Sequence, residues 1–175
     1  QFLTPPYNNT IKVVPYTTPS ERGYYCLDLN NYPYANYPNG SAFPVYPNPM
    51  SVSSFRHALA HCVDRSYYAT VITEGCSVPM YTLILPYMTY FLHPDIRPGG
   101  LLEELTHPYN LTEAERLFNL DHFPKGPDGW RYWDRNLNGV KDAGEGVTLK
   151  FYARVDHAWR KNIGIALTAI LEAEP

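Results

Sequence analysis

Three stretches of the sequence carry apolar side chains at helical spacing, and they constrain most strongly what this chain can fold into. The first covers about residues 52–70, the second starts at Thr112, and the third follows Asp156. Apolar residues three and four positions apart line one face of a helix, and that face is expected to be buried. A chain of 175 residues is long enough to bury a sizeable core, so one domain over residues 1–175 is expected.

Capping residues predict where two of these helices begin. Thr112 stands three positions before Glu115, which is the capping-box pattern, and Asp156 is a favourable N-cap. His57 and His61 are expected on the polar, solvent-facing side of the first helix. The side chains predicted for burial are Val52, Phe55, Leu59, Cys62 and Val63 in the first helix, Ala114, Leu117 and Phe118 in the second, and Trp159, Ile163, Leu167 and Ile170 in the third.

Strands are expected in three shorter stretches that are rich in β-branched and aromatic residues. These are residues 10–16 (TIKVVPY), 23–29 (GYYCLDL) and 147–155 (VTLKFYARV), and the last of them alternates apolar and polar side chains. The run WRYW at 130–133 precedes a turn sequence. About 130–155 is therefore predicted to form a hairpin.

Charge and hydropathy argue against two kinds of partner. The net charge is −3, so the chain has no basic footprint and nucleic acid is not expected to bind. The most apolar stretch, residues 80–92, is interrupted by Pro86 and is too short to span a bilayer. The first residues show no signal peptide, so an exported form is expected to carry its targeting segment upstream.

The three cysteines do not have the spacing of a zinc site. Cys62 lies on the predicted apolar face of the first helix and Cys76 follows that helix. A disulfide bridge between Cys62 and Cys76 is one possibility. Free thiols, as for Cys26, are the other, and both remain open.

Tyrosine and proline are unusually frequent, with 16 and 17 residues, and much of this bias lies in residues 27–49. Proline restricts the backbone and tyrosine rings pack against neighbouring surface, so a rigid surface loop is expected here. An aromatic platform for a ligand is the alternative.

Residues 134–145, DRNLNGVKDAGE, match the calcium-loop pattern D-x-[DN]-x-[DN]-G-x5-E. Calcium takes six to eight oxygen ligands, and Gly139 permits the sharp reversal that would wrap them round one ion. Neither flank looks helical, so the loop would lie between strands. A bound ion would be structural, because a loop filled by protein oxygens leaves no open position for a substrate. A solvated hairpin turn is the alternative. The candidate ligands are Asp134, Asn136, Asn138, the carbonyl of Val140, Asp142 and Glu145.

Two further sets of polar residues were weighed as sites. His57 and His61 are one helical turn apart, but a third ligand and the glutamate of H-E-x-x-H are missing, so a solvent-facing pair is expected. Arg154, Asp156 and His157 lie in a strand-to-helix loop, where α/β proteins often bind ligands. Arg154 would suit a carboxylate, and a surface ion pair with Asp156 is the alternative.

Four segments in chain order resemble family 5 extracellular solute-binding proteins, the oligopeptide- and dipeptide-binding components of ABC importers. Residues 13–31 are similar to the family's strand pair, and 48–82 to its "R-x-Al…DR…G-x-a-x-P" helix segment. Residues 109–123 are similar to its next helix, and 128–171 to its hairpin, strand and long helix. The positions that match within 48–82 are Phe55-Arg56, Ala58-Leu59, Val63-Asp64-Arg65, Gly75 and Pro79.

The resemblance implies an α/β fold that forms part of the C-terminal lobe of a two-lobed periplasmic-binding-protein type II fold. Residues 32–47 would be a Tyr/Pro-rich insertion, and the N-terminal lobe would belong to a longer parent protein. That parent would work outside the cytoplasmic membrane, secreted or tethered there, and deliver a peptide or other small solute to an ABC permease.

No arrangement of a nucleophile with a base, no phosphate loop and no paired catalytic carboxylates can be made out, so the protein is interpreted as a non-enzyme without a certain cofactor. One alternative to the transport interpretation is a calcium-stabilised extracellular structural or interaction module without a transport role. The second alternative is a hydrolase that uses His57 or His61.

Overall fold

The described part of the chain is built from helices and connecting segments. The computed structural model describes residues 26–29, 48–82, 84, 88–91, 93–96 and 106–173. Within these residues there are no strands, and the longer helices are α1 (Ser53–His61), α3 (Leu111–Leu120) and α4 (Ala158–Ala173). The shorter elements are η2 (Pro49–Ser51), α2 (Arg65–Tyr67), the π-helix η3 (Tyr68–Ile72), η4 (Thr89–Phe91) and η5 (Pro94–Ile96).

The first predicted helix, about 52–70, is broken in the structure. Helix α1 ends at His61, and the side chain of Asp64 then accepts a hydrogen bond from the amide of Tyr67 and so caps α2. Aspartate competes for backbone amides in this way and favours the start of a new helix over the continuation of an old one. The apolar face was predicted correctly in the main, since Phe55, Leu59 and Cys62 are buried.

Helix α3 begins two residues earlier than the predicted capping box requires. Asn110 is its N-cap, and the Asn110 side chain accepts a hydrogen bond from the amide of Glu113 at 3.0 Å. Thr112 lies inside the helix, so its predicted role as the cap is wrong. Asparagine is at least as good an N-cap as threonine, and the pattern alone does not decide between neighbouring candidates.

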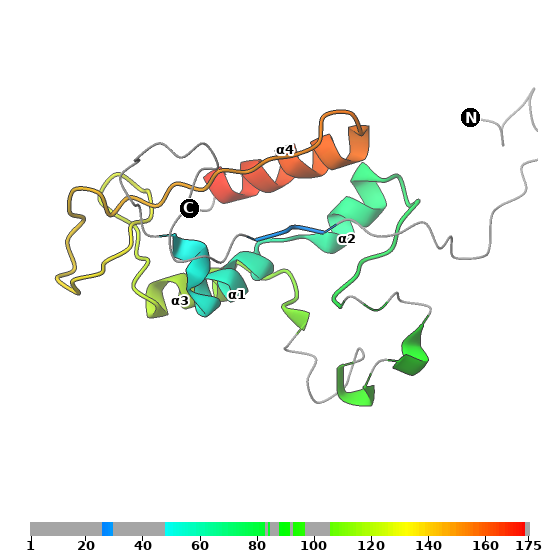
Figure 1. The fold of residues 1–175 in the computed structure, drawn as a ribbon, viewed down its shortest axis with the longest axis horizontal. Coiled ribbons are helices and arrows are strands. Elements are labelled where there is room, and N and C mark those ends of the chain that lie inside the picture. The colour runs from blue at the N-terminus through cyan, green and yellow to red at the C-terminus, as the bar shows by residue number, and fades with distance from the viewer. Residues whose placement is uncertain are drawn as a thin grey trace, which may run out of the picture.

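Helices α1 and α3 pack side by side through a cluster of phenylalanines (Figure 1). The ring of Phe55 from α1 lies 5.0 Å from that of Phe118 in α3 and 4.7 Å from that of Phe123, between ring centroids. Ala58 and Ala114 are almost fully buried, and their small side chains suit close approach of the helices. This cluster is the core of the described part.

The chain that follows α3 remains attached to this core through Arg131. The Arg131 guanidinium donates to the carbonyl of Phe123 at 2.7 Å and to the side chain of Asn119 at 3.1 Å. It also lies over the ring of Phe118, at 4.7 Å from its centroid. A buried charge is costly unless it is hydrogen-bonded, and these contacts satisfy two of the five N–H donors of the guanidinium.

The hairpin predicted over about 130–155 is present only at its base. Tyr132 and Gly146 form an isolated antiparallel bridge, with hydrogen bonds from Trp133 N to Glu145 O at 2.8 Å and from Val147 N to Arg131 O at 3.1 Å. Beyond this base, residues 148–155 are not assigned to a strand.

The segment 147–155 lies along helix α4 (Figure 1). A Cβ atom on Gly164 would come within 2.8 Å of the Ala153 Cβ and 2.9 Å of Phe151 Cε1. Glycine is therefore needed in this helix for close approach to the segment, despite its poor helix propensity. The predicted helix after Asp156 is confirmed, and Leu167 is buried on its inner face.

Several sequence-based expectations fall wholly or partly on residues outside the described part. These are the strand at 10–16, most of the strand at 23–29 and the Tyr/Pro-rich segment 32–47. The described residues 26–29 are not in a strand. Among the residues that the structure describes, no helix has the length and apolar character to cross a membrane.

The N-cap assignment predicts a difference between two neighbouring substitutions. Asn110→Ala removes a side-chain acceptor for an orphan amide and should lower the free energy of unfolding by about 1 kcal/mol. Thr112→Ala leaves the cap intact and should change it by less than about 0.5 kcal/mol. Urea unfolding of both variants tests this, and a larger loss for Thr112→Ala would restore the capping-box assignment.

Candidate functional site

The loop 134–145 is closed at its base by two buried acidic residues. Asp134 and Glu145 each have only 6% of their surface exposed. The amide of Asp134 donates to the carbonyl of His122 at 2.8 Å, and the carbonyl of Glu145 accepts from Trp133. The two ends of the predicted calcium loop are therefore held together against the core.

The carboxylate of Asp134 organises the first half of the loop. One of its oxygens accepts from the amide of Asn138 at 3.0 Å and the other from the amide of Gly139 at 2.9 Å. Leu137 and Gly139 both have positive φ, at 58° and 72°. Glycine takes this conformation at little cost, which explains its place at the reversal.

The second half of the loop folds round Glu145 and Asp142. The Glu145 carboxylate accepts from the amides of Asp142 at 3.1 Å and Arg135 at 3.4 Å. One Asp142 oxygen accepts from the side-chain nitrogens of Asn136 at 2.8 Å and Asn138 at 2.9 Å. All five side-chain ligands predicted for calcium therefore take part in one hydrogen-bonded loop.

The chemistry of these residues fits a calcium ion, because carboxylate and amide oxygens from one short loop are the ligands it prefers. The orientation of the amides does not point to an ion, since the nitrogens of Asn136 and Asn138 face Asp142. Among the described residues, no three His, Cys, Asp or Glu side chains are grouped as metal ligands. The calcium site at 134–145 stays a prediction, as does the alternative of a solvated turn.

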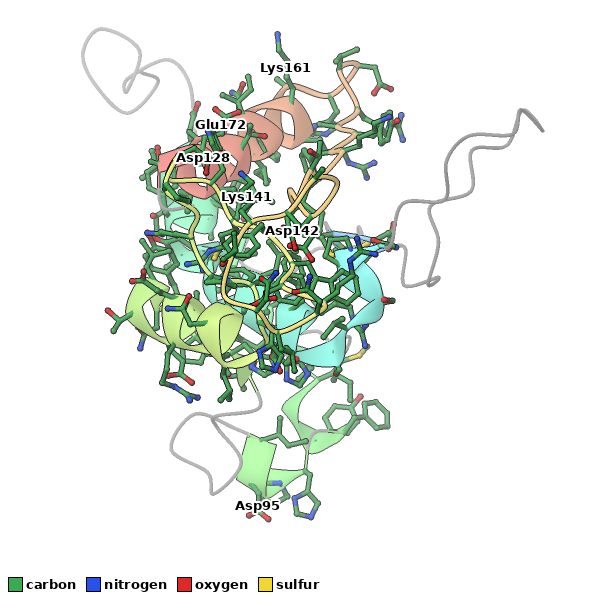
Figure 2. The ribbon with its side chains drawn as sticks, turned by 90° about the vertical axis from the view of Figure 1, so that its left-hand side faces the viewer. Asp95, Asp128, Lys141, Asp142, Lys161 and Glu172 are labelled. Carbon is green, nitrogen blue, oxygen red and sulfur yellow. The ribbon has the colours of Figure 1, made fainter. Side chains whose placement is uncertain are left out.

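The loop concentrates negative charge at its buried base. The pKa of Tyr132 is raised, first by burial and then by the charges of Asp134, Glu145 and Asp142. On the outer side, Lys141 forms an ion pair with Asp128, and this pair holds the pKa of Asp128 below its ordinary value (Figure 2). Lys141, one of the two basic residues of the loop, is thus paired with a carboxylate that is not among the predicted ligands.

The second predicted site lies between the extended segment and helix α4. Arg154 Nε donates to Asp156 Oδ1 at 3.0 Å, and both side chains are mostly exposed. This pair lowers the pKa of Asp156 and raises that of Arg154. Helix α4 begins at Ala158, and the carbonyl of His157 accepts a hydrogen bond from the amide of Lys161. His157 is therefore the residue at the N-cap position, and the predicted N-cap role of Asp156 is wrong.

His157 lies at the same join, with its ring centroid 5.8 Å from that of Trp159. The structure therefore brings Arg154 and Asp156 together as the surface ion pair that was the alternative. Ligand binding by Arg154, Asp156 and His157 stays a prediction.

The histidines of α1 differ from the prediction of a solvent-facing pair. His57 is exposed, whereas His61 is buried, with 8% of its surface exposed. His61 Nδ1 is 2.7 Å from the carbonyl oxygen of Pro108. A third histidine, His107, packs against both rings, with centroid distances of 4.6 Å to His57 and 5.2 Å to His61.

The three cysteines are free. Cys62 is buried, whereas Cys26 and Cys76 are exposed. Of the two possibilities that the sequence left open, the structure has the free thiols and not the bridge between Cys62 and Cys76.

Two residues of the described part were missed by sequence reasoning. The sequence indicates only that Arg131 is a charged residue of a predicted hairpin. Its burial depends on contacts with α3. His107 is separated from His57 and His61 by more than 40 positions. Neither has a local sequence signal, because both positions are set by how distant segments pack.

Comparison with known proteins gives no relative. No protein-family model, no curated protein and no solved structure matches this sequence.

If calcium binds the loop 134–145, it should raise the melting temperature of the chain. A free calcium concentration one hundred times Kd stabilises the folded state by about 2.7 kcal/mol. The measurement compares melting in excess calcium and in chelator.

The variants for this measurement retain the shape of the side chains. Glu145→Gln and Asp134→Asn should abolish the calcium-dependent rise, because each removes a charged ligand. Asp128→Asn is the matched control, since Asp128 lies outside the ligand set, and should keep the rise. An unchanged melting temperature in the parent sequence would leave the loop as a turn.

Proposed function

We propose that this chain is part of one lobe of an extracellular solute-binding protein that serves an ABC importer, with a peptide as the solute. The observation that carries the proposal is the order of four sequence segments, which follows that of family 5 solute-binding proteins from about residue 13 to residue 171. No single segment is decisive, but their order along most of the chain is fairly specific.

The packing of the described part is compatible with a lobe of this kind. An extended segment, 147–155, leads through an exposed join into the long helix α4 and lies along that helix. In α/β proteins such joins at the ends of strands are common places for ligand contacts. The expected sheet itself remains a prediction, because the described residues contain no strand.

The proposed mechanism is closure of two lobes about a hinge, which buries the solute in a cleft from which water is excluded. The second lobe would come from the rest of a longer parent chain, and the permease would be the partner to which the solute is delivered. The location would be extracellular or periplasmic. These features rest on the resemblance and not on the fold alone.

At the proposed site, Arg154 would bind the carboxylate of the peptide and exchange its present partner, Asp156, for the ligand. An arginine recognises a carboxylate through two parallel hydrogen bonds, and Arg154 already binds Asp156 through both Nε and Nη2. Because that ion pair is exposed, breaking it should cost little. His157 would lie next to the ligand.

A second candidate function is favoured by the buried acidic base of the loop 134–145. Asp134 and Glu145 are both buried, which is unusual for carboxylates that only serve a surface turn. A calcium-stabilised extracellular module without a transport role would use this loop to bind a structural calcium ion. The two functions are distinguished by whether a solute binds.

The transport proposal predicts that peptides stabilise the longer parent protein. A peptide that binds should raise its melting temperature, and an amidated peptide should bind less well if Arg154 holds the terminal carboxylate. Arg154→Met should weaken binding by roughly tenfold or more, as expected for the loss of a charged hydrogen bond. Asp156→Asn should not weaken it, because it removes a competitor for Arg154.

Arg116→Met is the matched control, because Arg116 is also an exposed arginine in an ion pair, with Glu113. Binding that survives Arg154→Met unchanged would reject the assigned residue but not the transport function. Failure of every peptide to raise the melting temperature would contradict the peptide-binding function itself.

A further inference from the structure

Three histidines from two distant segments meet at the end of helix α1. His57 and His61 lie one turn apart on α1, and His107 comes from the segment that leads into α3. The ring of His107 is tilted by 32° from that of His57 and meets that of His61 edge-on, at 78°. This arrangement brings the imidazole of His107 into contact with the two other imidazoles.

The segment that carries His107 is tied to α1 and α2 by its backbone. Arg65 Nη1 donates to the carbonyl of His107 at 3.0 Å, and the amide of Asn110 donates to the carbonyl of His61 at 3.0 Å. The contact between His61 Nδ1 and the carbonyl of Pro108 also requires the proton to be on Nδ1, because a carbonyl only accepts. Residues 107–110 are therefore held by three hydrogen bonds, two to His61 of α1 and one to Arg65 of α2.

The charged groups that face His107 all oppose its protonation. They are His57 and His61 from α1 and Arg65 from α2, and together with burial they lower the pKa of His107. From α3, Glu113 acts on the cluster only through His61, and it is already paired with Arg116. No carboxylate is among the groups of the described residues that act on the His107 ring.

Tyrosine hydroxyls do not supply the missing negative charge. Tyr81 lies under the Arg65 guanidinium, at 5.1 Å from the ring centroid, and its ring partly covers that charge. Burial raises the pKa of Tyr68 to about 12, so its hydroxyl is neutral throughout the range in which histidine titrates. Added positive charge on His107 would thus lie beside an arginine and two imidazoles.

We propose that His107 is an acid-sensitive latch, in which uptake of a proton by its imidazole releases residues 107–110 from α1 and frees the N-terminal end of α3. In the closed state the neutral ring stacks on His57 and His61. In the open state the protonated ring is in water and away from Arg65. Asn110, the N-cap of α3, leaves with the segment because its amide is one of the three ties.

The pH range in which the latch opens follows from the direction in which the pKa of His107 is shifted. The folded pKa of His107 is lowered below the ordinary value of 6.5, so the unfolded or open segment binds a proton more readily than the closed one. The closed state is fully favoured above about pH 6.5 and loses stability as the pH falls from there to the folded pKa. Within that window one proton changes the opening equilibrium by up to about tenfold per pH unit.

Amide hydrogen exchange of Asn110 between about pH 5 and 7.5 tests the latch. After correction for the intrinsic exchange rate, the protection of this amide should fall as the pH is lowered, by up to about tenfold per pH unit. His107→Asn removes the titrating group and should abolish the fall. Asparagine suits the position because His107 has a φ of +47°, which asparagine adopts readily.

His122→Asn is the matched control, because His122 also has a positive φ, at 65°, and is not in the cluster. It should keep the pH dependence. Equal behaviour of the two variants, or pH-independent protection in the parent chain, would overturn the proposal.

A measurement without substitutions covers the case in which His107→Asn does not fold. Titration of the His107 ring by NMR should give a lower midpoint in the folded chain than in the chain unfolded by urea. A midpoint that is equal or higher in the folded chain would overturn the proposal.

Discussion

The contact of Phe55 with Phe118 and Phe123 is the interaction on which the rest of the described structure depends. It joins α1 to α3 and to the segment that follows α3, with ring centroids 5.0 Å and 4.7 Å apart. Phe123 is fully buried in this cluster, and the base of the loop 134–145 is attached to the preceding residue, because the amide of Asp134 donates to the carbonyl of His122. Phe55 therefore packs on the segment to which the base of the loop is attached.

Arg131 connects this core to the segment that leads into the loop, and burial of its charge costs free energy. Only 8% of the surface of Arg131 is exposed, and among the described residues its Nε has no hydrogen-bond partner. Burial lowers the pKa of Arg131 and the charge of Glu115 opposes that shift. Such groups rarely add much net stability, but they fix one arrangement of the segments that bind them. Here they fix the segment 123–134 against α3.

The spacing of apolar residues along the sequence predicted the buried face of the first helix and the presence of the last helix. The apolar stripe of the first helix placed Phe55, Leu59 and Cys62 in the core, and the long final helix is present as expected. Helix ends were less well predicted, because Asp64 and Asn110 each compete with neighbours for the same backbone amides. The outcome of that competition depends on the packing of the whole chain and not on a short pattern.

The candidate sites show the same division. The calcium pattern at 134–145 is local, and the structure does close these residues into one hydrogen-bonded loop. The burial of His61 and its contact with His107 were not predicted, because they depend on a segment that is distant in sequence. The expected α/β sheet and the solute site need residues and partners beyond those that the structure describes.

Native-state hydrogen exchange in a Phe55→Leu variant tests most directly whether the helices and the loop base form one unit. The informative amides are those of Cys62 at the end of α1, Phe123 after α3 and Asp134 at the loop base, each of which is hydrogen-bonded. If Phe55 holds them together, all three should lose protection by the same factor. Loss at Cys62 and Phe123 with no change at Asp134 would contradict the account, because the loop would then fold independently of the phenylalanine core.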